Sequence, residues 1–149
     1  MEFPLMYGLE KVGLPLICTT DDLIFLIDTG ANHSVLFTFI YEYLKDSLKE
    51  QDDTRQMVGM EGNKVDVNKV EGTINILDKD YTHTFSVYDG SKIVSCIQEK
   101  SGVQIHGILG MDFIVRNKWI LDFERFVVIE KEENVNSQDK NQENARCYI

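Results

Sequence analysis

The chain has 149 residues, the length of one ordinary domain, and its 43% hydrophobic and 27% charged content is typical of a soluble globular protein. A formal net charge of -10 disfavours nucleic acid and anionic membranes as partners, because both attract basic surfaces. No apolar run reaches the roughly 18 residues that span a bilayer, and the start lacks the basic and apolar regions of a secretory signal, so we expect a cytoplasmic protein.

The cysteines and histidines are scattered along the chain and form no recognised metal or redox motif. There is no C-x-x-C pair and no H-E-x-x-H sequence, which are common zinc-binding arrangements. We therefore expect no metal site, no cofactor, and free thiols in a reducing compartment. The residues concerned are Cys18, Cys96, Cys147, His33, His83 and His106.

Most apolar clusters are short, rich in Ile, Val, Phe and Tyr, and interrupted by Gly, Asn or Asp, a pattern typical of short strands and tight turns. A mostly β domain is therefore predicted. Between residues 65 and 76 the apolar positions change phase near Asn68 and Lys69, which predicts a β-bulge. The predicted strands cover residues 9–18, 23–27, 34–36, 55–60, 65–77, 81–88, 93–97, 104–109, 119–123 and 126–129.

Two helices are predicted among these strands. The first begins near Thr38 and the second, which is shorter, spans residues 111–117. The apolar face of the first helix is formed by residues at helical spacing, namely Ile40, Tyr41, Leu44 and Leu48. From residue 131 to residue 144 only Val135 is a large apolar residue, so we expect residues 1–130 to form the domain and residues 131–149 to be a disordered polar tail.

The most distinctive local feature is an apolar strand that runs directly into Asp28-Thr29-Gly30-Ala31. By itself, an Asp-Thr-Gly turn after a strand is more often structural than catalytic, because Asp and Gly are common turn formers. About eighty residues later, however, Ile108-Leu109-Gly110 places two bulky aliphatic residues before a glycine at the start of the second predicted helix. The combination of the two motifs is more informative than either one alone.

In this order and at this separation, the two motifs resemble those of the retropepsin family of aspartic proteases, the single-domain retroviral type. The resemblance covers roughly residues 9–130. It implies a closed acid-protease β-barrel with one central helix and one short late helix. It also implies that residues 119–123 and 126–129 form the hairpin that closes this fold.

The resemblance also assigns roles to individual residues. Asp28 is expected to be the catalytic carboxylate, Thr29 to form a hydrogen bond with the partner chain's turn, and Gly30 to allow close backbone approach. Ala31 completes the active-site turn. The remaining motif residues are expected to pack around this turn: Ile108, Leu109 and Gly110.

Between the two motifs the family has a flap, a β-hairpin that folds over bound substrate, and residues 57–65 occupy that place. Two glycines near the centre predict a mobile tip, and the neighbouring Met and Val residues are expected to contact apolar substrate side chains. An ordinary hairpin turn would explain the glycines equally well. The predicted flap residues are Met57, Val58, Gly59, Met60, Glu61 and Gly62.

The number of active-site turns predicts the assembly. Pepsin-like chains carry two such turns, whereas this chain carries one. Because the chemistry needs one carboxylate as base and a second as acid, the second must come from another chain. The resemblance thus implies an aspartic endopeptidase that acts as a homodimer on extended polypeptides, with a second copy and a polypeptide substrate as its partners.

Two other interpretations stay open. The first keeps the fold without the activity, as a catalytically silent dimerisation or peptide-binding module. The second is a small monomeric β-barrel that binds a ligand and in which Asp28 merely ends a strand. We interpret His33 as structural and Asp112 as a cap of the late helix, and no local context supports a thiol protease site at Cys96.

Overall fold

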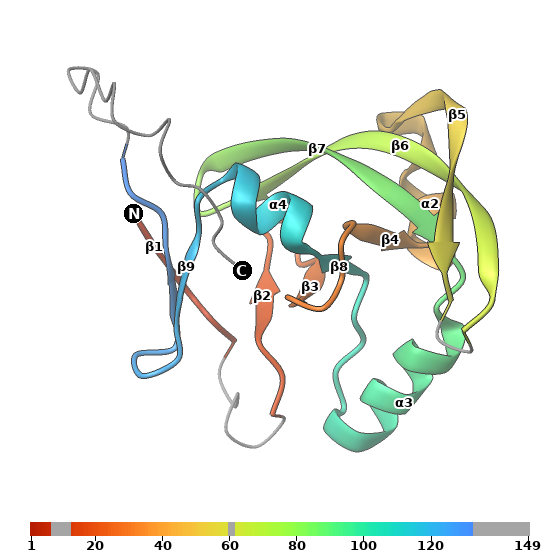
Figure 1. Cartoon of the computed structure of the whole chain (residues 1–149). Coiled ribbons are helices and arrows are strands. Elements are labelled where there is room, and N and C mark those ends of the chain that lie inside the picture. Colours follow the sequence, from red (N-terminus) through yellow and green to blue (C-terminus); the bar gives the residue numbers. More distant parts are fainter. Residues whose placement is uncertain (7–12, 60–61, 133–149) are drawn as a thin grey trace, which may run out of the picture.

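The computed structural model describes residues 1–6, 13–59 and 62–132, which form two β-sheets and three α-helices (Figure 1). The larger sheet has the strand order β2-β3-β8-β4-β7-β6-β5, and the smaller one has the order β1-β10-β9. The larger sheet consists of β2 (Leu16–Cys18), β3 (Ile24–Ile27), β4 (Val35–Phe37), β5 (Lys49–Val58), β6 (Lys64–Ile76), β7 (Lys79–Tyr88) and β8 (Gly107–Leu109). The other elements are β1 (Glu2–Pro4), β9 (Ile120–Asp122), β10 (Val127–Ile129), α2 (Thr38–Leu44), the 3-10 helix η1 (Lys45–Ser47), α3 (Ser91–Ser101) and α4 (Met111–Arg116).

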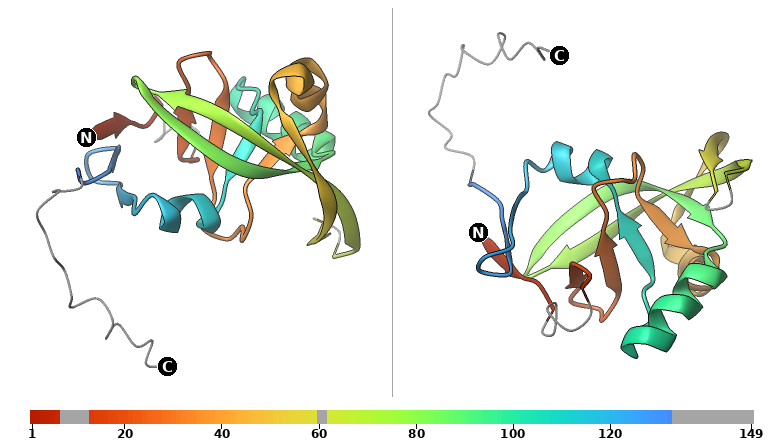
Figure 2. Two further views of the ribbon diagram at one scale, coloured as in Figure 1. Left: turned by 90° about the horizontal axis from the view of Figure 1, so that it is seen from above. Right: turned by 60° about the horizontal axis from the view of Figure 1, so that its bottom comes forward.

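The predicted mostly β architecture is confirmed, but the strands do not form the expected closed barrel. β2 and β5 are the two edges of the seven-stranded sheet and are not paired with each other in the described part of the chain. β6 and β7 are long, with 13 and 10 residues, and their twisted ribbon carries β5 away from β2 (Figure 2). The twisted sheet therefore remains open, with β2 and β5 as its two edges.

The segment predicted as a strand at residues 93–97 is instead part of helix α3, so the expectation of only one central and one late helix is wrong. Its apolar residues Ile93, Val94 and Ile97 have the spacing of a helix face that packs on the core. The helix ends at Gly102, which has a left-handed φ of 74° and donates its N–H to the Gln98 carbonyl. An apolar run this short does not distinguish a helix from a strand by its period.

Several boundaries also differ from the predictions. β5 begins at Lys49 and not at residue 55. The prediction missed its first residues because they are polar and mostly exposed at a sheet edge, so they show no apolar pattern. The irregularity expected near Asn68 is present, but the extra residues lie on β5, where the pairing with β6 shifts between Glu50 and Thr54. Strand β1 was not predicted. Part of the predicted strand 9–18 and most of the predicted tail lie outside the described residues.

Aromatic side chains join the two sheets. The ring of Trp119 lies 5.8 Å from that of Phe3 and 5.0 Å from that of Phe113, and Tyr81 contacts all three rings. Each fully buried aromatic side chain contributes about 1.5–3 kcal/mol through the area it removes from water. This cluster anchors α4, which follows β8, and so fixes the region where β8 lies between β3 and β4.

Helices long and apolar enough to cross a membrane are not found among the residues that the structure describes.

Candidate active site

The turn that follows β3 is held at its first residue by β8. The backbone N–H of Asp28 donates to the carbonyl of Leu109 at 3.0 Å, and the N–H of Ala31 donates back to the carbonyl of Asp28 at 3.2 Å. The carboxylate Oδ1 of Asp28 accepts the N–H of Gly30 at 2.9 Å. The turn therefore presents a half-buried carboxylate with one oxygen fixed by its own backbone.

The second motif interlocks with this turn. β8 runs parallel to β3 and antiparallel to β4, so Leu109 and Gly110 arrive beside the residues that follow Asp28. A Cβ atom on Gly110 would lie 2.7 Å from the carbonyl oxygen of Ala31, which leaves no room for a side chain. The next residue, Met111, donates its N–H to that same carbonyl at 2.7 Å. Leu109, Gly110 and Met111 thus pack directly against the turn.

Asp112, in the first turn of α4, links the two motifs through a second set of hydrogen bonds. Its carboxylate accepts the Ser34 hydroxyl at 2.7 Å and the Ser34 N–H at 3.1 Å, and it lies 3.0 Å from Nε2 of His83. Burial alone would raise the pKa of Asp112, but hydrogen bonds from His83 and Ser34 outweigh it and hold the pKa well below its usual range. Asp112 also accepts the Phe113 N–H at 2.8 Å. The N-cap position of α4 is Gly110, without a side-chain cap bond, so the interpretation of Asp112 as the cap is wrong, and its carboxylate instead bonds Ser34 and His83 across the fold.

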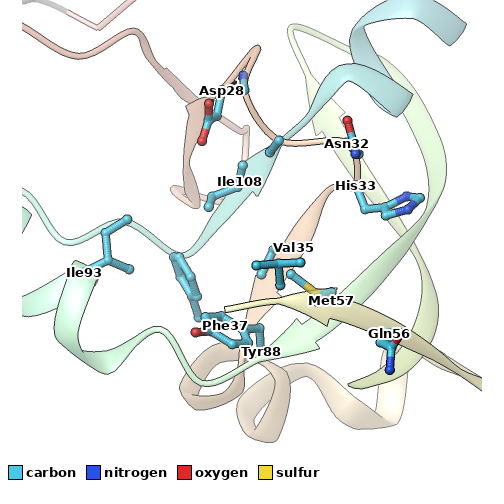
Figure 3. Close-up of a pocket in the computed structure, with 13 residues that line it drawn as sticks. Asp28, Asn32, His33, Val35, Phe37, Gln56, Met57, Tyr88, Ile93 and Ile108 are labelled. Carbon is cyan, nitrogen blue, oxygen red and sulfur yellow. Dashed lines mark hydrogen bonds between the residues drawn. The ribbon is translucent and has the colours of Figure 1, made fainter. Parts of the chain in front are cut away.

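A cleft of about 430 Å³ opens beside Asp28 (Figure 3). The Asp28 turn and β8 form one side, and the end of β5 forms another. Its walls are mainly apolar, with Val35 and Phe37 from β4, and Tyr88 from the end of β7. The lining residues are Asp28, Gly30, Ala31, Asn32, His33, Val35, Phe37, Gln56, Met57, Val58, Tyr88, Ile93 and Ile108.

The structure brings six of the predicted site residues together at this cleft: Asp28, Gly30, Ala31, Met57, Val58 and Ile108. Thr29 is exposed beside it, whereas Leu109 and Gly110 are buried behind it. In the predicted flap, Gly62 donates its N–H to the carbonyl of Gly59 at 2.9 Å, which closes the loop between β5 and β6. Met60 and Glu61 lie outside the described residues.

Sequence reasoning missed several residues of the cleft. Phe37 and Tyr88 reach it because β4 pairs in parallel with β7, which places these two residues opposite each other. Ile93 reaches it from the first turn of α3, the helix that was predicted as a strand. His33, interpreted from the sequence as structural, also lines the cleft, and its pKa is lowered by burial and by the nearby Arg55. The strand pairing, which the sequence does not state, would have identified Phe37 and Tyr88.

Among the described residues, no group of three or more His, Cys, Asp or Glu side chains is arranged to hold a metal ion. Asp28 is the only acidic residue among those that line the cleft. Among the described residues that line the cleft, one chain therefore supplies a single carboxylate, that of Asp28, beside the imidazole of His33.

Comparison with known proteins agrees with this geometry. Residues 20–113, more than half of the chain, match the aspartyl protease family. The retroviral protease-like domain of Ddi1 from Leishmania major has a similar fold, with a TM-score of 0.53, 14% sequence identity, and coverage of 89% of this chain and 91% of that chain. At this identity the likeness concerns the fold alone. Among curated proteins, no sequence matches the chain significantly. The chain thus belongs to the aspartyl protease family and has a retropepsin-like fold.

Proposed function

We propose that this protein is an aspartic endopeptidase that hydrolyses peptide bonds in extended polypeptides and is active as a homodimer. The observation that carries the proposal is the intact Asp28-Thr29-Gly30-Ala31 turn, anchored by Leu109 and Met111 and presenting its carboxylate at an apolar cleft. A turn that only ended a strand would not need a second motif packed against it. The same interlocking argues against the monomeric ligand-binding alternative.

The dimer follows from the chemistry. One carboxylate cannot act as base and acid in the same step, and the described cleft residues include no second acidic side chain. In our proposal the Asp28 turns of two chains meet, with the exposed Thr29 of each turn at the contact. Two carboxylates about 3 Å apart cannot both ionise, so they share one proton and titrate as a pair.

In the proposed reaction the two Asp28 side chains have different roles at any one moment. The ionised carboxylate takes a proton from a water molecule held between the chains, and that water attacks the scissile carbonyl carbon. The protonated carboxyl transfers its proton to the carbonyl oxygen, which becomes a hydroxyl of the tetrahedral diol. The C–N bond then breaks: the carboxyl that took the proton from water gives it to the leaving amine, and the other carboxylate takes a proton from a diol hydroxyl, which leaves the carboxylic acid product. Water, and not Asp28, is the nucleophile, so no covalent enzyme intermediate forms.

The shape of the cleft supports a peptide substrate. Its apolar walls suit side chains on an extended chain, because such chains point alternate residues to opposite sides. In our proposal the hairpin between β5 and β6 acts as a flap, with Met57 and Val58 covering the bound peptide. Val58 is largely exposed in the described chain, so a bound peptide would remove its apolar surface from water.

The test is cleavage of a diverse peptide pool, read by mass spectrometry, with wild type and the Asp28→Asn variant. The amide is nearly isosteric but does not accept the proton from water, so we expect cleavage to fall by about 1000-fold or more while the fold is retained. Asp46→Asn, at an exposed position on η1 and not among the residues that line the cleft, is the matched control and should cleave normally. Cleavage that survives Asp28→Asn in a pure preparation would exclude the mechanism, and a folded wild type that cleaves nothing would favour the silent module.

A further inference from the structure

His83 is a buried histidine on β7 that lies outside the cleft. It is only 6% exposed, and its ring contacts the edges or faces of Phe85 and Phe113 at 5.5 Å and 5.1 Å between centroids. Its Nδ1 atom is buried without a hydrogen-bond partner. An apolar side chain of similar size would fill this space without burying an unpaired nitrogen, so packing alone does not account for an imidazole here.

The other ring nitrogen has one polar partner. Nε2 of His83 lies 3.0 Å from Oδ2 of Asp112, and the pair joins β7 to the start of α4. The depressed pKa of Asp112 keeps this carboxylate ionised, which favours Nε2–H as the donor in the pair. His83 therefore restrains the carboxylate of Asp112 from a position inside the core.

From Asp112 a continuous series of hydrogen bonds leads to the Asp28 turn. Oδ1 of Asp112 accepts the hydroxyl of Ser34 at 2.7 Å, and the oxygen of that hydroxyl accepts the N–H of Gly110 at 3.0 Å. Ser34 is fully buried, so water does not replace these bonds. On the same side, the N–H of Asp112 donates to the carbonyl of Asn32 at 3.3 Å. These contacts fix the distance between the start of α4 and the residues that follow Asp28.

We propose that His83 is a positioning residue for the Asp28 turn: by holding the Asp112 carboxylate, it keeps Ser34 against Gly110 and so sets how Asp28 is presented to the cleft. His83 touches neither the cleft nor Asp28, and its effect passes through Asp112 and Ser34. The expected consequence for turnover rests on the proposed protease function. The expected consequence for the turn itself does not.

The test compares His83→Leu with His83→Gln, whose side-chain amide can still donate to Asp112. Amide hydrogen exchange of Ala31, Gly110 and Met111 is followed by NMR, together with kcat and KM on a cleaved peptide. In His83→Leu we expect exchange at these amides to rise about tenfold or more. We also expect kcat to fall about tenfold or more with little change in KM, because misplacing a reacting group lowers turnover more than it lowers binding. His83→Gln should recover most of both losses.

Two further variants separate positioning from general stability. Ser34→Ala breaks the same series of hydrogen bonds nearer the turn. It should raise amide exchange at the turn and lower kcat in the same way, and it provides the test even if His83→Leu folds poorly. Tyr81→Phe removes a different buried hydrogen bond from the same strand, the one from the Tyr81 hydroxyl to Glu130. It should lower the melting temperature and leave exchange at the turn unchanged.

Wild-type exchange and wild-type kcat in His83→Leu and in Ser34→Ala would overturn the proposal. So would an increase in exchange that is uniform over β6 and β7 and is matched by Tyr81→Phe, since that would make His83 a contributor to global stability only. If wild type cleaves no peptide, the proposed function fails, but the exchange measurements still decide whether His83 holds the turn.

Discussion

The Asp28 turn and the hairpin between β5 and β6 face the same cleft but are built in opposite ways. The turn is held by Leu109, Met111 and the hydrogen bonds of Asp112. Leu109 and Ser34 are fully buried, and Met111 and Asp112 are half-buried. In the hairpin, β5 is an edge strand whose residues are mostly exposed, and its only strand partner is β6. The comparison indicates that many packed contacts surround the proposed catalytic group and that fewer hold the proposed flap, which is what a flap that opens and closes requires.

The largest effect on stability is expected at Gly110. In Gly110→Ala the new Cβ would lie 2.7 Å from the backbone oxygen of Ala31 and 3.0 Å from the backbone of His33. Because backbone atoms on both sides must move, we expect a loss of about 3 kcal/mol in the free energy of unfolding. Urea unfolding measures this loss, and a loss below 1 kcal/mol, on the order of a surface substitution, would show that the turn is not held as tightly as described.

Removing the charge of Asp112 tests the network behind the turn. Asp112→Asn retains the size of the side chain but weakens its bonds to His83 and Ser34, so we expect a loss of about 2 kcal/mol near neutral pH. The pKa of Asp112 is lower in the folded chain than in the unfolded chain. The charged carboxylate therefore stabilises the fold fully at pH values above the unfolded pKa, and this stabilisation is lost as the pH falls through the folded pKa. The difference between wild type and variant should thus shrink below about pH 4. A difference that is independent of pH in acid would contradict the depressed pKa.

In the hairpin, the same kind of glycine substitution should matter less. Gly62 has a φ of +83°, and a Cβ atom there would meet nothing within 4 Å. Gly62→Ala therefore carries only the backbone strain of a left-handed alanine, about 1 kcal/mol. Urea unfolding of Gly62→Ala beside Gly110→Ala compares the two regions directly. Equal losses at the two positions would remove the distinction between a rigid turn and a loosely held hairpin.

The sequence predicted the parts of this site that lie in local motifs. Asp28 to Ala31 and Ile108 to Gly110 are continuous segments whose residue types and order carry the information, and most of the strands follow from short apolar runs. Ile93 was assigned to a strand because its apolar run is too short to show a helical period. Phe37, Tyr88 and His83 depend on which strands pair, and that choice is made by long-range packing that no local pattern contains.

The central claim is that two Asp28 carboxylates, one from each of two chains, form one catalytic site. The most direct measurement mixes wild type with increasing amounts of Asp28→Asn at constant total protein and allows the subunits to exchange. If only the dimer with two Asp28 residues is active, the cleavage rate falls with the square of the wild-type fraction, to about one quarter in an equal mixture. A rate that falls in simple proportion to the wild-type fraction, to about one half in the same mixture, would mean that a single chain suffices and would contradict the account.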